Sequence, residues 1–172
     1  MKIRILGALL ISLLAACGES DSDEIYNENN TNVVDGVVYD INEKPINGTY
    51  KIYYPNGNVK MEVKSKNGKP DGLGRFYNED GNILFEGNFA DGLMNGKMLN
   101  FYPDGSIHNE INYTKGKPNG TYRTYNQDGT LVVEVVFENG KATKGYALIQ
   151  EHKIDLTPED LQEISEPEQP LQ

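Results

Sequence analysis

The feature that most constrains the fold of this chain is a 24-residue repeat that runs four times without an insertion. An Asn-Gly or Asp-Gly pair opens each unit, a second such pair lies in its middle, and a further glycine comes near its end. Self-similarity at a fixed period indicates stacked copies of one supersecondary unit, each burying its apolar side chains against its neighbours. The four units are Asn47–Pro70, Asp71–Met94, Asn95–Pro118 and Asn119–Ala142.

Between the glycine pairs, apolar and polar residues alternate, as they do at Val59, Met61 and Val63. Period-two alternation is typical of a strand with one drier face. An Asn-Gly or Asp-Gly pair between two such runs is a strong hairpin signal, because both central residues of a type I′ turn need φ > 0. The sequence therefore predicts an all-β domain with one hairpin per unit.

Two strand registers are compatible with this pattern. A two-residue turn at Asn56 and Gly57 pairs position 51 with 62 and position 52 with 61. Alternatively, Pro55 and Pro103 suit a type I turn with a G1 bulge, which shifts the register by one and exchanges the faces. The two-residue register is favoured because it pairs like with like across each hairpin. On one face it predicts ion pairs, with Leu99–Glu110 as the exception: Lys51–Glu62, Arg75–Glu86 and Arg123–Glu134. On the other face it predicts pairs of similar residues: Ile52–Met61, Phe76–Phe85, Gly74–Gly87, Met98–Ile111, Tyr122–Val135 and Asn100–Asn109.

The first residues have the pattern of an export signal. Lys2 and Arg4 precede the apolar run Ile5–Leu14, which is too short to span a bilayer comfortably. The run ends in Leu14-Ala15-Ala16-Cys17, which resembles the lipobox of bacterial lipoproteins, and Cys17 is the sole cysteine of the chain. The resemblance implies removal of residues 1–16 and lipidation of Cys17. By the same resemblance to bacterial lipoproteins, Gly18 in place of Asp implies an outer-membrane location, on the periplasmic or surface side, in a cell with two membranes.

Charge and composition frame the segments around the repeats. Without Lys2 and Arg4 the chain has 14 basic and 26 acidic residues, a net charge of −12. Such a chain is not expected to bind nucleic acid or anionic lipid, so the predicted membrane contact is the lipid. Residues 17–32 are polar and acidic, which predicts a disordered tether after the lipidated cysteine.

The domain predicted after the tether spans residues 33–150. Val33–Tyr39 is expected to be a strand of a degenerate half-unit, and Thr143–Gln150 the start of another unit, because terminal repeats depart from consensus. In the remaining segment, 151–172, Thr157-Pro158 followed by two acidic residues predicts an N-cap and a short helix to about Ser165. The end of the chain reads as an acidic, Pro-containing tail.

The repeat units resemble the MORN-repeat variant of bacteria. The pattern is carried by Asn119-Gly120-Thr121-Tyr122, by Tyr125 to Gly129 and by Glu134 to Gly140. This resemblance covers roughly Asp35 to Tyr146 and implies an elongated, single-layer, twisted antiparallel sheet of stacked hairpins. It implies little about chemistry. Proteins of this kind are often described as antitoxin-like or left without a function.

The chain shows no catalytic constellation. The two histidines, His108 and His152, lack a periodic carboxylate or nucleophile partner, and the glycines read as turn residues. The Asp-Gly turns lack the longer loop and bidentate glutamate that a calcium cage needs. We therefore expect no enzymatic activity, no metal and no cofactor.

Two repeated rows of side chains are the candidate binding residues. The favoured register places an aromatic row on the same face as a glutamate row. Amphipathic aromatics on one side of a thin sheet suit contact with a protein or glycan, and they also suit packing against each other. The predicted function is a lipid-anchored, non-catalytic binding or scaffold module of the cell envelope; the alternative is an antitoxin or immunity-like protein. The predicted binding face comprises Tyr53, Tyr77, Phe101, Tyr125, Glu62, Glu86, Glu110 and Glu134.

Overall fold

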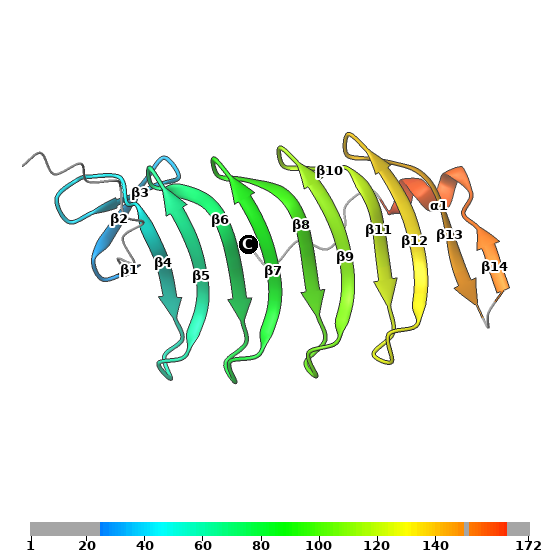
Figure 1. Cartoon of the computed structure of the whole chain (residues 1–172), viewed down its shortest axis with the longest axis horizontal. Helices are drawn as coiled ribbons and strands as arrows, with labels where there is room; N and C mark the ends of the chain where they lie inside the picture. The colour runs from blue at the N-terminus through cyan, green and yellow to red at the C-terminus, as the bar shows by residue number, and fades with distance from the viewer. Residues whose placement is uncertain (1–24, 150–151, 165–172) are drawn as a thin grey trace, which may run out of the picture.

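The computed structural model describes residues 25–149 and 152–164. Apart from one short helix, its regular structure is β-strand (Figure 1). The elements are β1 (Ile25–Asn27), β2 (Thr31–Val34), β3 (Val37–Asp40), β4 (Gly48–Tyr53), β5 (Val59–Lys66), β6 (Lys69–Tyr77), β7 (Ile83–Ala90), β8 (Leu93–Phe101), β9 (Ile107–Thr114), β10 (Lys117–Pro118), β11 (Gly120–Tyr125), β12 (Leu131–Glu138), β13 (Lys141–Ile149), β14 (His152–Asp155) and α1 (Pro158–Glu163).

These strands confirm the predicted all-β fold. Twelve of the described strands form one sheet, in the order β1-β4-β5-β6-β7-β8-β9-β11-β12-β13-β14, with β10 beside β9. From β4 to β14 each strand pairs antiparallel with the next, so the units form one continuous meander (Figure 1). The short β1 differs, because it pairs with β4 in parallel. Strands β2 and β3 form a separate hairpin at the N-terminal end of the sheet.

The turns in the middle of the units have the geometry of the alternative that was not favoured. In the first unit only Gly57, and not Asn56, has a positive φ, at 88°. The Gly57 N–H donates to the carbonyl of Tyr54, and the Tyr54 N–H donates to the carbonyl of Asn58. A three-residue loop with a left-handed glycine at its end is the type I turn with a G1 bulge. The same bonds recur in the other three units.

The register beyond these turns is nevertheless the favoured one. Tyr53 pairs with Val59, but Ile52 pairs with Met61, so Lys60 bulges out of the ladder. The three-residue turn shifts the register by one residue, and this bulge shifts it by one residue in the opposite sense. Beyond the bulge, the register is the one that a two-residue turn would give. All ten predicted pairs, from Lys51–Glu62 to Asn100–Asn109, are therefore confirmed. The bulged residues in the four units are Lys60, Leu84, His108 and Val132.

Type I′ turns lie near the end of each unit, at the strand ends opposite the middle turns (Figure 1). Asn67 and Gly68, for example, both have positive φ, at 51° and 74°. Each turn glycine also donates its N–H to a carbonyl 22 residues earlier, as Gly68 does to Ile46. These hydrogen bonds stack the turns along one side of the sheet, at the ends of the strands. The four turns are Asn67-Gly68, Asp91-Gly92, Lys115-Gly116 and Asn139-Gly140.

The Asn-Gly and Asp-Gly pairs that open the units are not turns, which corrects their reading as turn residues. In units two to four they lie where the first strand of the unit pairs irregularly with the strand before it. The glycines of all four opening pairs have φ between 116° and 150°. In the first unit the Asn47 side chain accepts a 2.9 Å hydrogen bond from the N–H of Asn67. Asp71 and Asn95 do the same for the next two turns. The opening residue of each of these units therefore caps the following type I′ turn.

The apolar face of the sheet holds the core in two clusters. The larger cluster contains seven buried residues, and α1 with the segment before it packs against its C-terminal end through Leu156, Leu161 and Ile164. The smaller cluster lies at the N-terminal end. Both ends of the repeat array are thus covered by elements outside the four units. The buried residues are Phe85, Met98, Ile111, Tyr113, Tyr122, Val135 and Phe137 in the larger cluster, and Tyr26, Ile46, Tyr50 and Val63 in the smaller.

The N-terminal boundary of the folded part corrects the predicted tether. Residues 25–32, assigned to a disordered segment, instead form β1 and the start of β2, and Tyr26 is buried in the smaller cluster. The stretch predicted as one strand, Val33–Tyr39, is a hairpin with a type I′ turn at Asp35 and Gly36. The signal, Cys17 and the tether up to residue 24 lie outside the described residues.

The predicted C-terminal helix is confirmed. Thr157 is the N-cap, Pro158 opens the helix, and Thr157 and Asp160 exchange the two hydrogen bonds of a capping box. The helix ends at Glu163 with Ile164 as its C-cap, slightly before the predicted end. In the part of the chain that the structure describes, no helix is long and apolar enough to cross a bilayer.

Candidate functional site

One face of the sheet carries a row of alternating charges. Each strand from β4 to β12 in the order of the sheet contributes one residue to this row. Each residue of the row is the cross-strand partner of the residue on the neighbouring strand. Cations and carboxylates alternate along this row except at Leu99. We call this surface the polar face, and its row consists of Lys51, Glu62, Arg75, Glu86, Leu99, Glu110, Arg123 and Glu134.

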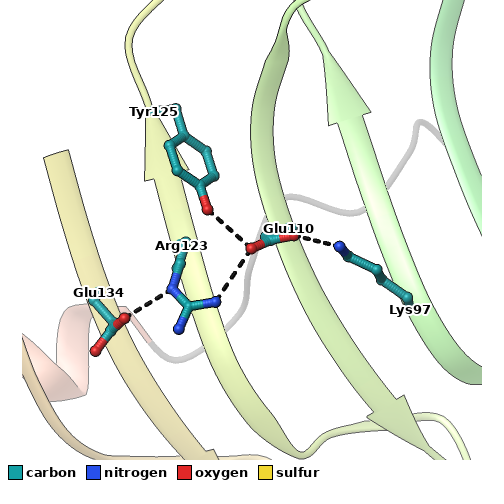
Figure 2. Close-up of polar contacts among 5 residues, drawn as sticks. All are labelled: Lys97, Glu110, Arg123, Tyr125 and Glu134. Carbon is teal, nitrogen blue, oxygen red and sulfur yellow. Dashed lines mark hydrogen bonds and ion pairs between the residues drawn. The ribbon is translucent and has the colours of Figure 1, made fainter. Parts of the chain in front are cut away.

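Glu110 is the centre of one charged cluster (Figure 2). Its carboxylate pairs with Lys97 on one side and, at 3.3 Å, with Nη1 of Arg123 on the other. The hydroxyl of Tyr125 donates a third bond, at 2.9 Å. Arg123 also reaches Glu134, with 2.8 Å between its Nε and the carboxylate. The hydrogen bond from Lys97 holds the pKa of Glu110 below its ordinary value, aided by Tyr125 and Arg123.

Glu62 is the centre of an equivalent cluster at the other end of the row. It accepts a 2.7 Å hydrogen bond from the Tyr77 hydroxyl and pairs with Lys51 at 3.3 Å and with Arg75 at 3.6 Å. Arg75 continues to Glu86, with its Nε at 2.8 Å. The bond from Tyr77 is the main reason that the pKa of Glu62 lies below its ordinary value.

The tyrosine hydroxyls are fixed in the same clusters. Partial burial, followed by the hydrogen bond to Glu62, raises the pKa of Tyr77 to about 12. Partial burial and the bond to Glu110 raise the pKa of Tyr125 as well. Both tyrosines therefore stay neutral donors at physiological pH, and their rings are half-buried. The clusters thus hold charged groups and tyrosine hydroxyls in defined positions on the polar face.

The two clusters reveal a second, longer period of 48 residues. Units one and three share Tyr-Pro before the middle glycine pair and Lys-Pro at their end, whereas units two and four share the arginine and tyrosine of the clusters. Tyr54 and Tyr102 each donate their hydroxyl to a carbonyl of the next unit, at Tyr77 and Tyr125. The structural unit of the polar face is thus a pair of hairpins.

The structure brings six of the eight predicted binding residues into these clusters. All four glutamates lie in the row, and Tyr77 and Tyr125 bond to two of them. Tyr53 and Phe101 lie half-buried at the equivalent places without such a bond to a glutamate. The hydroxyls of Tyr77 and Tyr125 are bonded to glutamates within the sheet, which is a different structural use from the packing of the aromatics against each other.

Lys97 is the member of the clusters that the 24-residue pattern did not single out. It reaches Glu110 from two residues before Leu99, on the same strand, and so gives Glu110 the cation that Leu99 does not supply. The 48-residue period is the signal that could have pointed to Lys97. It shows that the arginines of the row, Arg75 and Arg123, occur in units two and four, so units one and three need another cation.

The excess negative charge lies outside the repeats. Residues 47–142 contain 11 basic and 11 acidic residues, and the polar face is built from balanced pairs. The acidic surplus is therefore carried by the segments on both sides of the array. The repeat array itself has no net charge.

The polar face has a small hollow beside the Glu62 cluster. A shallow hollow of about 120 Å³ lies between β4, β5 and β6, lined by Glu62, Lys64, Leu73 and Arg75 among others. Ligand pockets are several hundred cubic ångströms in size. Among the described residues, no group of three or more His, Cys, Asp or Glu side chains could hold a metal ion. The hollow has the size for a partner's side chain.

Comparison with known proteins identifies the repeats. The family described as MORN repeat variant matches residues 46–67, 70–91, 94–115 and 118–139, together about half of the chain. No curated protein matches the sequence.

Among solved structures, similarity extends to two crystal structures of TarM. One is a mutant of S. aureus TarM in complex with Fondaparinux, alpha-GlcNAc-glycerol and UDP, at 15% identity and a TM-score of 0.33; the other is titled as TarM, at 17% and 0.32. Each covers 73% of this chain, which spans about a fifth (21%) of their length.

Proposed function

This chain belongs to the MORN repeat variant family, and on that basis we propose that it is a non-catalytic protein-binding module of the bacterial cell envelope. MORN repeats are generally protein- or membrane-binding modules. The polar face supports a protein and not a membrane as the partner of the sheet. On this face two clusters hold charged and aromatic side chains in fixed positions at the surface. Preorganised groups of this kind lower the entropic cost of association.

The membrane attachment in this proposal is a lipid on Cys17. Its support is the pattern of residues 1–17: two cations, a short apolar run and small residues before a sole cysteine. Two or three acyl chains exceed the single chain that gives marginal binding. Gly18 supports the outer membrane as the destination. Only seven residues, 18–24, separate Cys17 from the start of β1, so the sheet is held close to its anchor.

Fractionation tests the anchor. The wild-type chain is expected in the outer-membrane fraction, Cys17→Ser in the soluble fraction or retained as precursor, and Gly18→Asp in the inner membrane. A wild-type chain that is soluble in the periplasm would contradict the lipid attachment.

Affinity capture from envelope extracts tests the binding face. The lipidated full chain, purified in detergent, is compared with the double variant Tyr77→Ala/Tyr125→Ala, which removes the two half-buried aromatic rings from the polar face. Lys66→Ala/Lys115→Ala, at the edge with the type I′ turns, is the matched control. We expect one or more proteins to be captured by the wild type and the control and lost from the tyrosine variant. Retention of every captured protein by the tyrosine variant would contradict the proposal.

An antitoxin or immunity-like role is the second candidate. Its support is the segregation of charge: outside residues 47–142, and without residues 1–16, there are 15 acidic and 3 basic residues. Acidic segments on both sides of a neutral array suit capture of a basic protein. Co-expression with the product of a neighbouring gene tests this role. Rescue of growth from a toxic neighbour would support it, and the absence of any toxic neighbour together with unchanged fitness on deletion would contradict it.

A further inference from the structure

The polar face has one place where its regular pattern is broken. At Glu62 and at Glu110, the following strand supplies an arginine and, two residues later, a tyrosine whose hydroxyl donates to the same carboxylate. Each of these glutamates also pairs with a lysine from the preceding strand. Their carboxylates are thus neutralised from both sides.

Glu86 lies at the equivalent place in the second unit, but its following strand is different. Strand β8 places Leu99 directly opposite Glu86 and Phe101 two residues further on. These residues take the positions of the arginine and the tyrosine, and they supply neither a cation nor a hydroxyl. Among the described residues, the ion pair of Glu86 is with Arg75 of the preceding strand, through Oε2.

The nearby cations are already engaged with other carboxylates. Lys97, on the same strand as Leu99, pairs with Glu110. Arg75 is shared, because its Nη1 also contacts Glu62. Glu86 is at the same time the most exposed of the four glutamates, with 29% of its side chain accessible against 24%, 15% and 24% for Glu62, Glu110 and Glu134. An accessible carboxylate thus lies beside a half-buried apolar pair, Leu99 and Phe101.

The corresponding place at Glu134 is covered from within the chain. There the following strand sets Tyr146 opposite the glutamate, and the ammonium of Lys153 lies 4.2 Å from the centre of the Tyr146 ring. The place beside Glu86, near the middle of the row, has no such cover among the described residues.

We infer that Glu86, Leu99 and Phe101 form a subsite for a basic side chain of a protein partner. The cation takes the position in the row that Leu99 leaves without charge and pairs with Glu86, while its aliphatic stem packs on Leu99 and Phe101. Arginine fits best, because its planar guanidinium donates to a carboxylate from a fork and stacks on an aromatic ring. The inference rests on the proposed function, since it names the chemistry by which the polar face selects a protein.

A neutral isostere of arginine distinguishes charge-dependent binding at this subsite from nonspecific binding of a peptide to the sheet. The full-length mature chain is titrated with acetyl-Gly-Arg-Gly-amide, and in parallel with the citrulline peptide of the same sequence, which has the same shape without the charge. Two-dimensional NMR of the Leu99 methyl groups and of the Glu86 and Phe101 amides reports binding. The methyl groups of Leu131 and of Leu161 on α1 serve as internal references.

We expect the arginine peptide to shift the Leu99, Glu86 and Phe101 signals saturably and the citrulline peptide to leave them in place. Glu86→Gln is expected to lose the shift, and Leu99→Arg to lose it at the two amides, because the cation is then supplied by the chain. Glu138→Gln, an exposed glutamate at the turn edge, is the control that keeps it. Equal shifts with both peptides, an unchanged shift in Glu86→Gln or Leu99→Arg, or no shift at all would overturn the inference.

The outcome is distinguishable from that of the capture experiment. If the arginine peptide binds at Glu86 while captured proteins are indifferent to Tyr77→Ala/Tyr125→Ala, the subsite stands and the proposed function fails. If capture depends on the tyrosines but the peptide does not bind, the proposed function stands and the subsite fails.

Discussion

The hydroxyl of Tyr77 donates a 2.7 Å hydrogen bond to Oε1 of Glu62 on the neighbouring strand. We expect Tyr77→Phe to lower the free energy of unfolding by about 1 kcal/mol, because the partly exposed carboxylate loses a donor while the ring is kept. Urea denaturation measures the change. Tyr53→Phe is the control, since no glutamate precedes it in the row, and it should differ from the wild type by less than about 0.5 kcal/mol. Equal losses in the two variants would contradict a specific role for the Tyr77 bond.

Stability should fall in acid through Glu62 and Glu110. Their pKa values in the folded chain lie below the ordinary value near 4.5, because the ionised carboxylates accept hydrogen bonds and face cations. This contribution is present above about pH 4.5 and is lost as the pH falls through the lower folded-state pKa. Urea unfolding from pH 7 to pH 3 should therefore show a smaller acid loss for Glu62→Gln/Glu110→Gln than for the wild type. Parallel curves would argue against these carboxylates as the source.

The loss of folding stability at alkaline pH should depend on Tyr77. Its pKa of about 12 in the folded chain exceeds the ordinary value of 10.0, so the neutral hydroxyl stabilises the fold below pH 10. That contribution is lost as the pH rises through 12. A spectrophotometric titration of tyrosinate should show a component with a midpoint near 12 that disappears in Tyr77→Phe. Its persistence in this variant would assign the late titration to another tyrosine.

The two kinds of turn should differ in their tolerance of a side chain. Gly57 and Gly68 both have positive φ, but a Cβ on Gly57 meets open space, whereas one on Gly68 comes within 2.5 Å of the Val38 carbonyl oxygen. Gly57→Ala should cost about 1 kcal/mol from backbone strain alone. Gly68→Ala should cost more than about 2 kcal/mol, because the β2–β3 hairpin must shift. Thermal denaturation of the two variants checks the order, and a reversed order would contradict the packing of the hairpin on this turn.

Truncation should lower stability far more at a buried position of a strand than at an exposed position of the same strand. Ile111 and Ile107 lie on the same strand, with 0% and 37% of their surface exposed. Ile111→Ala should cost about 2–5 kcal/mol through lost burial and a cavity. Ile107→Ala should cost about 1 kcal/mol or less. Chemical denaturation measures both, and similar costs would indicate that the centre of the sheet relaxes around the missing atoms.

Much of the fold could be predicted from local sequence signals. The middle glycine pairs fix the hairpins, and the capping pattern from Thr157 to Asp160 fixes the helix, because each acts through bonds between residues close in sequence. The cross-strand pairs were also predictable, although for an incomplete reason. The bulge at Lys60 cancels the shift made by the G1 turn, so a register derived from the wrong turn type gave the right partners.

Other features depend on contacts between distant segments. Ile25–Asn27 carries too little apolar surface to look folded, yet it pairs with β4 and buries Tyr26 against residues far along the chain. The capping of a turn by Asn47 spans 20 residues, and no local rule connects the two. The reach of Lys97 to Glu110 depends on how the two strands align. Such contacts become visible only once the strands are placed side by side.

The pairing of hairpins also determines how this architecture can change in length. Loss of residues 71–118 would bring the first unit against the fourth, and Glu62 would face Arg123 and Tyr125 as replacements for Arg75 and Tyr77. Loss of residues 71–94 alone would set Glu62 against Leu99 and Phe101 and leave one carboxylate without its partners. Duplication or deletion by two units is therefore conservative, whereas a single unit changes the surface. A gene encoding such a sheet can grow in even steps and keep its ion pairs.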